Sequence, residues 1–167
     1  MKAFLLKDQK HFMNQLLKSE LFDHFLLSEA AIHGAVSCHV DGRMNRDFFD
    51  AEEFEELTAD GSEYIPFSYF RPVCYELIRG KHTPVYLKFV FLLSPENARK
   101  TIASADCGLS DRDVGGMFLN FSFREGTMTL TTGISYRTFT ADHTLDAAWD
   151  ALAARFLTKN QISFDVQ

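Results

Sequence analysis

The side chains best suited to bind a ligand lie between Phe25 and Val40, where polar and apolar residues alternate. A period of two is typical of a strand, because successive side chains point to opposite faces. One face then carries the polar set Glu29, His33, Ser37 and His39. Carboxylates and imidazoles transfer protons and bind metals, so this face is a candidate site for a small enzyme or a ligand-binding protein.

A metal ion shared by His33 and His39 sets a strict condition on the backbone. Along one continuous strand the two residues lie roughly 20 Å apart, at about 3.3 Å per residue. Zinc ligands must each come within about 2 Å of the ion, so sharing requires the chain to fold back near Gly34 or Ser37. Gly34 interrupts the alternation and leaves open one bent strand or two. We expect surface or hydrogen-bonded histidines, with no metal and no cofactor.

Signatures of other catalytic chemistry are missing from the sequence. It contains no G-x-S-x-G motif, and Cys38, Cys74 and Cys107 are widely spaced with no C-x-x-C pair. Gly115-Gly116 precedes an expected strand, whereas a phosphate-binding loop precedes a helix. The sequence therefore favours a binding role over catalysis and leaves the question of an enzyme open.

An acidic stretch and a neighbouring aromatic pair form a second candidate surface. Eight acidic residues lie between Asp47 and Glu63; such a run is most often a solvated helix face, and alternatively it recruits a basic partner. Phe48-Phe49 stands at its start, near Arg43 and Arg46. Adjacent aromatic residues in a turn-rich region predict an exposed patch for a protein partner.

Composition bounds the class of protein. The chain has 167 residues, of which 46% are hydrophobic and 24% charged, as expected for one globular domain. The net charge of −6 argues against broad, non-specific coating of nucleic acid or of an anionic membrane. The N-terminal apolar run is too short for a secretory signal, and three unpaired cysteines are typical of a reducing compartment. We expect a cytoplasmic protein with no membrane partner.

Local patterns predict an α+β fold with an antiparallel sheet and helices on one face. Asp8 and Ser94 are expected to cap helices, Asp41-Gly42 and Glu125-Gly126 to form turns, and Pro72 to lie in the first turn of its helix. The expected elements are strands at 2–6, 25–40 and 85–93, helices at 9–18, 51–57, 67–79, 95–104 and 144–157, and a β-hairpin at 117–139.

The order of these elements suggests a single domain, 1–167, with an internal repeat. Strand, helix, strand, strand occurs at about 1–42 and again at 85–139, with an insert at 43–84 between the copies and a C-terminal helix at about 144–157. The expected sheet with helices on one face would then be built from two β-α-β-β units.

Parts of the chain resemble one domain of the DNA sliding clamps. The similarity is carried by Gly116-Met117-Phe118-Leu119-Asn120-Phe121, by Thr127-Met128-Thr129-Leu130-Thr131-Thr132 and by Tyr136-Arg137. Clamps usually have an Asp after the threonine-rich strand, where this chain has Gly133, and they carry two or three domains per chain. The resemblance implies a non-enzymatic binding or assembly protein. It implies DNA contact through Lys10, Lys18, Arg99 and Lys100, and a homo-oligomer, since a clamp ring holds six such domains.

Over its whole length the chain also resembles an uncharacterised family of short proteins from anaerobic Gram-positive bacteria. The segments that carry this similarity are Phe25-Leu26-Leu27-Ser28-Glu29-Ala30, Val40-Asp41-Gly42-Arg43, Arg46-Asp47-Phe48-Phe49 and Arg79-Gly80-Lys81-His82-Thr83-Pro84. This resemblance implies a cytoplasmic bacterial protein and supplies no activity.

Overall fold

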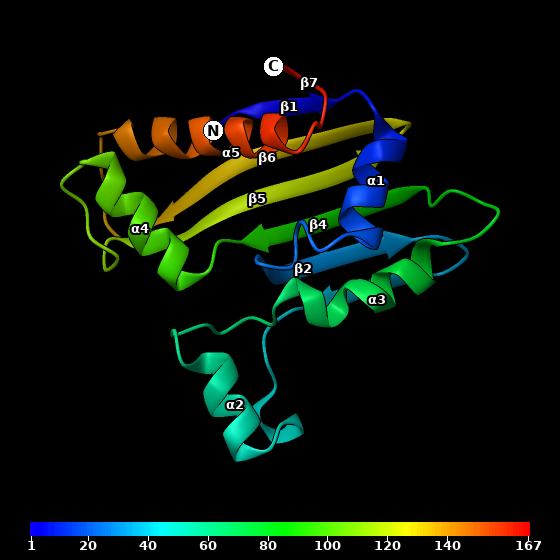
Figure 1. Cartoon of the computed structure of the whole chain (residues 1–167), viewed down its shortest axis with the longest axis horizontal. Coiled ribbons are helices and arrows are strands. Elements are labelled where there is room, and N and C mark those ends of the chain that lie inside the picture. The colour runs from blue at the N-terminus through cyan, green and yellow to red at the C-terminus, as the bar shows by residue number, and fades with distance from the viewer.

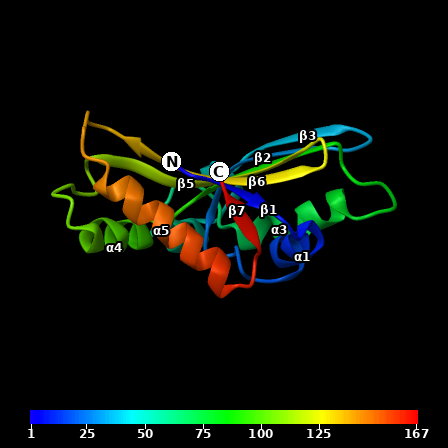
Figure 2. The same ribbon diagram turned by 90° about the horizontal axis from the view of Figure 1, so that it is seen from above.

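The computed structural model describes residues 1–167 and contains one seven-stranded sheet in the order β3-β2-β4-β5-β6-β1-β7, in which every pair of neighbours is antiparallel. Helices α1, α3, α4 and α5 lie on one side of the sheet (Figures 1 and 2). The predicted α+β class is thus confirmed. The elements are β1 (Ala3–Leu6), α1 (Gln9–Lys18), β2 (Leu26–His33), β3 (Ser37–Asp41), the 3-10 turn η1 (Arg46–Phe48), α2 (Ala51–Thr58), α3 (Phe67–Ile78), β4 (Tyr86–Leu92), α4 (Pro95–Ala105), β5 (Val114–Arg124), β6 (Thr127–Tyr136), α5 (Thr144–Lys159) and β7 (Phe164–Val166).

Local signals set several of these boundaries as predicted. The Asp8 carboxylate accepts a hydrogen bond from the His11 amide at 2.9 Å and so caps α1. Ser94 caps α4 in the same way, with Pro95 as the first helical residue. Between β5 and β6, Glu125 and Gly126 adopt φ angles of 52° and 76°, as a tight hairpin turn requires.

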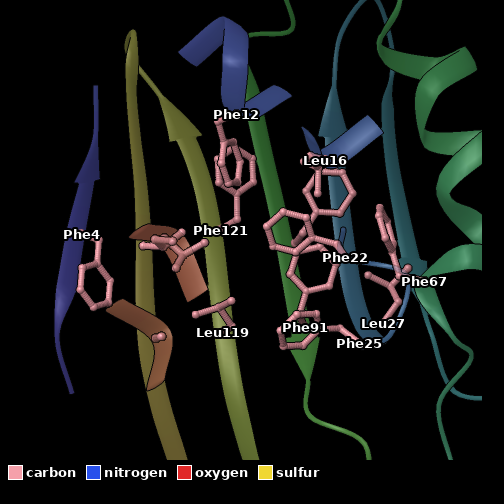
Figure 3. Packing of buried hydrophobic residues seen from close by; sticks show 14 of the residues in the cluster. Phe4, Phe12, Leu16, Phe22, Phe25, Leu27, Phe67, Phe91, Leu119 and Phe121 are labelled. Atoms are coloured by element: carbon pink, nitrogen blue, oxygen red, sulfur yellow. The ribbon is translucent and has the colours of Figure 1, made fainter. Parts of the chain in front are cut away.

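The core fills the space between the sheet and the helices that cover it. Alternate residues of β4 and β5, among them Phe89, Phe91 and Phe121, point into this layer and are fully buried. Phe12 of α1 packs on Phe121 with ring centroids 4.8 Å apart, and Phe22 stacks on Phe91 at 5.3 Å (Figure 3). The high phenylalanine content of the chain is therefore largely an internal packing feature.

The segment 25–40 is not the single continuous strand in which His33 and His39 would lie roughly 20 Å apart. It forms two strands, β2 and β3, which pair antiparallel with His33 opposite Ser37. The Gly34 amide donates to the Val36 carbonyl at 3.0 Å and closes the reversal between them. The chain therefore folds back at Gly34, the position where the alternation is interrupted.

Three further details differ from the expectations. Asp41 ends β3, and Gly42 forms no turn but packs on β2, its amide donating to the Ser28 carbonyl at 3.0 Å. Pro72 is the sixth residue of α3 and so lies beyond its first turn. Strand β7 has only three residues, too few for a periodic signal in the sequence.

The pairing of strands is not the same in the two repeat-like units. In the second unit β4 pairs with β5, the strand that follows its helix. In the first unit β1 does not pair with β2; it lies at the other side of the sheet between β6 and β7. None of the helices is both long and apolar enough to cross a membrane.

Candidate functional site

The predicted polar face of the β2–β3 segment lies on the side of the sheet that carries no helix. Glu29 and His33 stand on β2 and Ser37 and His39 on β3, and the cross-strand register places all four on this open face. The imidazole rings of His33 and His39 have centroids 5.1 Å apart. The fold thus brings together two residues for which a continuous strand would give a separation of about 20 Å.

Strand β4 adds two residues, Tyr86 and Lys88, to the four that the sequence pattern places on this face. The ring of Tyr86 packs on His33 with centroids 4.9 Å apart, and the ammonium group of Lys88 pairs with the Glu29 carboxylate at 2.9 Å. Only the pairing of β2 with β4, which aligns His33 with Tyr86, reveals these neighbours.

Hydrogen bonding at this face is incomplete. The Nε2 atom of His33 is buried and has no hydrogen-bond partner. Two cavities of the molecule are lined by other residues. One of about 460 Å³ lies between α4 and α5 beside Trp149 and Phe156, and another of about 300 Å³ contains Arg99 and Arg137.

The second candidate surface protrudes from the body of the molecule as an acidic arm, which we define as residues 45–62. The arm contains η1 and α2, and α2 stands away from the sheet (Figure 1). Asn45 and Asp50 cap the two elements with their side-chain oxygens, the latter accepting from the Glu53 amide at 2.8 Å. No residue of α2 is buried.

An aromatic patch lies where the arm meets α3, and we define it as Phe48, Phe49, Phe54 and Tyr69. Phe49 is at its centre, with ring centroids 5.2 Å from Phe48 and 6.2 Å from both Phe54 and Tyr69. Phe48 is nevertheless 71% exposed and Tyr69 is 50% exposed. The predicted exposure of Phe48 therefore agrees with the structure, while Phe49 is half-buried beneath it.

The two arginines predicted beside this patch are held by the chain's own aromatic rings. The guanidinium of Arg46 lies 5.0 Å from the centre of the Phe54 ring. Arg43 lies 5.5 Å from the Tyr64 ring centre and donates to its hydroxyl at 3.3 Å, which raises the pKa of the arginine. Arg46 thus packs on a ring within the arm and Arg43 on a ring at its base, and neither forms an ion pair with an acidic residue of the arm.

The arm accounts for the net charge of the protein. It holds seven of the 23 acidic residues and one of the 17 basic residues, so the net charge of −6 resides in the arm and the rest of the chain is neutral. No ion pair within the chain involves the four glutamates of α2. These carboxylates are therefore available to form ion pairs with a positively charged partner.

The base of the arm is closed like a hairpin. Arg43 forms an antiparallel β-bridge with Tyr64, and the Met44 amide donates to the Glu63 carbonyl at 3.0 Å. The Ile65 amide then donates to the Gly42 carbonyl at 2.8 Å, and the Leu27 amide to the Ile65 carbonyl at 2.8 Å. The arm thus leaves and re-enters the body at one point beside β2.

The four cations predicted to contact DNA are all exposed on the helix-covered side of the sheet. Lys10 and Lys18 belong to α1, and Arg99 and Lys100 to α4. The two helices lie at opposite ends of that side (Figures 1 and 2). Lys100 pairs with Glu96 at 2.6 Å and thereby lowers the pKa of that carboxyl, so its charge is already partly compensated.

Two ionisable groups with raised pKa values, the buried Cys74 and the half-buried Tyr136, lie outside all of these surfaces. Burial raises the pKa of the Cys74 thiol to about 12, which makes it a poor nucleophile. Burial, followed by the hydrogen bond that the Tyr136 hydroxyl donates to Asp146 at 2.8 Å, raises the pKa of Tyr136. Neither group is activated for catalysis at neutral pH.

The chain belongs to a protein family of unknown function (DUF5721), which matches it over residues 15–165. This agrees with the expected membership of an uncharacterised family. No curated protein and no solved structure matches the chain. The similarity to sliding clamps therefore rests on the short segments that first suggested it.

Proposed function

We propose that this protein is a binding protein whose acidic arm docks a basic, amphipathic segment of a partner protein. The observation that carries the proposal is the exposure of Phe48, 71% of whose surface faces solvent although it packs edge-on against Phe49. A large aromatic side chain that is exposed to solvent on an aromatic cluster is a typical anchor of a protein interface.

The charge of the arm specifies the chemistry of the partner. Glu52, Glu53, Glu55 and Glu56 belong to α2, the helix that also contributes Phe54 to the patch, and they form no internal ion pair. Complementary charges steer association and fix the orientation of the bound segment. The partner segment would therefore carry Lys or Arg beside apolar side chains, the latter covering Phe48 and Tyr69.

Binding of a defined peptide tests this proposal. The probe is a synthetic helical peptide with leucine and lysine at helical spacing, and its control is the same peptide with glutamate in place of lysine. We expect the lysine peptide to bind and Phe48→Asp to weaken it about tenfold or more, because loss of an anchor residue costs at least about 1.4 kcal/mol.

A matched variant separates this effect from a general loss of surface hydrophobicity. Phe139 is 98% exposed and lies outside the arm, so Phe139→Asp should leave peptide affinity unchanged. Equal affinity of the wild-type protein and Phe48→Asp would refute the proposal. The same would follow if the glutamate peptide bound as tightly as the lysine peptide.

A second proposal is that DNA contacts Lys10, Lys18, Arg99 and Lys100. It is supported by the exposure of these four side chains on one side of the sheet. Each phosphate contact adds about 0.9 to the slope of affinity against salt, so the contact should weaken steeply as salt rises. Replacing all four residues by glutamate should abolish retention of duplex DNA, and unaltered retention would contradict the proposal.

If the protein surrounds DNA as a sliding clamp does, several copies of the chain must also assemble into a ring. A chain that contributes one domain would have to form a closed multimer, ideally of six copies, to surround DNA. Light scattering at low and moderate salt measures the native mass. A discrete closed oligomer would support a ring, and a monomer would remove the ring while leaving the proposal for the arm untouched.

A further inference from the structure

The open face of the sheet contains one polar atom whose environment is unexplained. Nε2 of His33 is the only buried side-chain nitrogen or oxygen without a hydrogen-bond partner in the molecule. Buried polar atoms are almost always partnered, so an exception calls for a physical reason. A ring nitrogen without a proton carries a lone pair, and either a hydrogen-bond donor or a metal ion can satisfy it.

On β3, the strand that pairs with β2 through the reversal at Gly34, the ring that contacts His33 is that of another histidine, His39. His33 faces Ser37 across the strand pair and His39 faces Ala31, which makes the two histidines diagonal neighbours on the same face. Side chains in this relation are within reach of each other when they are long or aromatic. Their ring centroids are 5.1 Å apart and their planes are inclined at 63°.

This separation matches the one that a shared tetrahedral ion requires. Each nitrogen lies about 2.0–2.1 Å from a zinc ion and roughly 1.1 Å from the centre of its ring, so two rings at a tetrahedral angle have centroids about 5 Å apart. The observed centroid distance of 5.1 Å is therefore compatible with two imidazoles that share one ion. On the other side of His33, toward β4, the ring of Tyr86 packs against the imidazole with ring centroids 4.9 Å apart.

We propose that His33 and His39 bind one divalent zinc-type metal ion across the β2–β3 hairpin, with water completing the coordination. His39 is exposed on the helix-free side, which gives the ion a path from solvent. No group of three or more histidine, cysteine, aspartate or glutamate side chains is arranged to hold a metal, and the Glu29 carboxylate is engaged by Lys88 at 2.9 Å. The site thus has two protein ligands, and imidazole selects zinc over hard cations such as magnesium.

Calorimetric titration of the whole chain with zinc chloride tests the site. We expect one zinc ion per chain, and loss of that binding in His33→Ala and in His39→Ala. His39 is exposed, so its replacement keeps the fold even if the half-buried His33 position proves sensitive. His82→Ala, at an exposed histidine in the connector before β4, is the matched control and should bind zinc as the wild-type protein does.

A stability measurement gives an independent readout. An ion that binds only the folded hairpin raises the midpoint of thermal unfolding, so zinc should raise it for the wild-type protein and for Cys38→Ser, but not for His39→Ala. Magnesium should raise none of them. The proposal is overturned if the wild-type protein binds no zinc, if His39→Ala binds it with unchanged affinity, or if Cys38→Ser loses it while both histidine variants retain it.

Discussion

Gly42 shows how one residue without a side chain lets the arm join the sheet. A Cβ atom at this position would overlap the carbonyl group of Leu27 on β2. The overlap is with backbone, which cannot rotate away. The close approach is what allows the Gly42 amide and carbonyl to bond with Ser28 and Ile65 at 3.0 and 2.8 Å.

We therefore expect Gly42→Ala to lower the free energy of unfolding by about 2 kcal/mol or more, as overpacked positions do. Gly34→Ala is the matched substitution, because a Cβ there meets no atom within 4 Å. It should change stability by less than about 1 kcal/mol. Urea unfolding of both variants measures the difference, and equal effects would show that the contact with Leu27 is unimportant.

The three cysteines should differ in reactivity. Cys74 is fully buried in α3 and its thiol has a pKa of about 12, whereas Cys38 and Cys107 are half-buried. With Cys38 and Cys107 replaced by serine, a thiol reagent should label Cys74 only after denaturation. Rapid labelling of the native variant would contradict the burial of this side chain.

The raised pKa of Cys74 also predicts the sign of a pH effect. The folded state favours the protonated thiol, so this contribution to stability is complete below the ordinary value of 9.0 and is lost as the pH rises toward about 12. Cys74→Ala should therefore lose less stability than the wild-type protein over that interval. Denaturant unfolding at several pH values measures the two slopes, and identical slopes would refute the assignment.

The histidine pair marks the limit of inference from residue spacing. Alternation correctly places Glu29, His33, Ser37 and His39 on one face, because pleating fixes the direction of each side chain. It cannot give the distance between two of them, since that depends on whether the chain turns at Gly34. The exposure of Phe48, by contrast, was predictable from the sequence, because Phe48 and Phe49 are adjacent aromatic residues in a turn-rich region.

At the scale of elements, a buried hydrogen bond ties α5 to the sheet. The hydroxyl of Thr132 on β6 donates to the carboxylate of Asp150 on α5, and both side chains are buried. The Lys2 amide, just before β1, donates to the same hydroxyl at 2.9 Å. One side chain therefore connects a helix with two neighbouring parts of the sheet.

Thr132→Val keeps the volume of the side chain but leaves Asp150 without this donor. We expect it to cost about 1–3 kcal/mol of stability, the penalty for an unsatisfied buried polar group. Thr131→Val, on the opposite face of the same strand, should change stability by about 0.5 kcal/mol or less. Thermal unfolding compares the pair, and similar midpoints for the two variants would exclude the proposed role.

Elements were predictable where a local signal controls them. Asp8, Ser94 and the Glu125-Gly126 turn each act through hydrogen bonds or backbone angles within a few residues, and each is found as predicted. The pairing of β1 with β6 and β7 has no such signal, because it joins residues far apart in the sequence. The expected placement of Pro72 in the first turn was wrong, because α3 begins at Phe67, as its apolar stripe predicts, and Pro72 is therefore its sixth residue.

At the scale of the whole molecule, the acidic arm is a separable part. Its two ends meet at the Arg43–Tyr64 bridge, and α2 contributes no buried residue. Replacing residues 45–62 by Asn-Gly, which favours a tight hairpin turn, should leave the sheet and its core intact. The shortened chain would have no net charge, since the arm holds all of it.

We expect this shortened protein to fold cooperatively, to elute from an anion exchanger at lower salt than the full chain, and to lose binding of the lysine-rich peptide. Circular dichroism and thermal unfolding test the first expectation. Failure to fold would show that contacts such as Phe49 with Tyr69 are required by the body of the protein. Retained peptide binding would place the docking surface outside the arm.

The position of β1 has a consequence for the timing of folding during synthesis. Ala3 pairs with Thr131, and the facing partner of β1 on its other side is β7. At roughly 5–20 residues per second, a ribosome needs on the order of 6–25 s to proceed from Ala3 to Thr131. Throughout that interval the first strand of the nascent chain has neither of its neighbours, and Phe4 and Leu6 have no completed core to enter. Folding of this sheet is therefore completed late, and a product interrupted before β6 would leave the ribosome with its first strand unpaired.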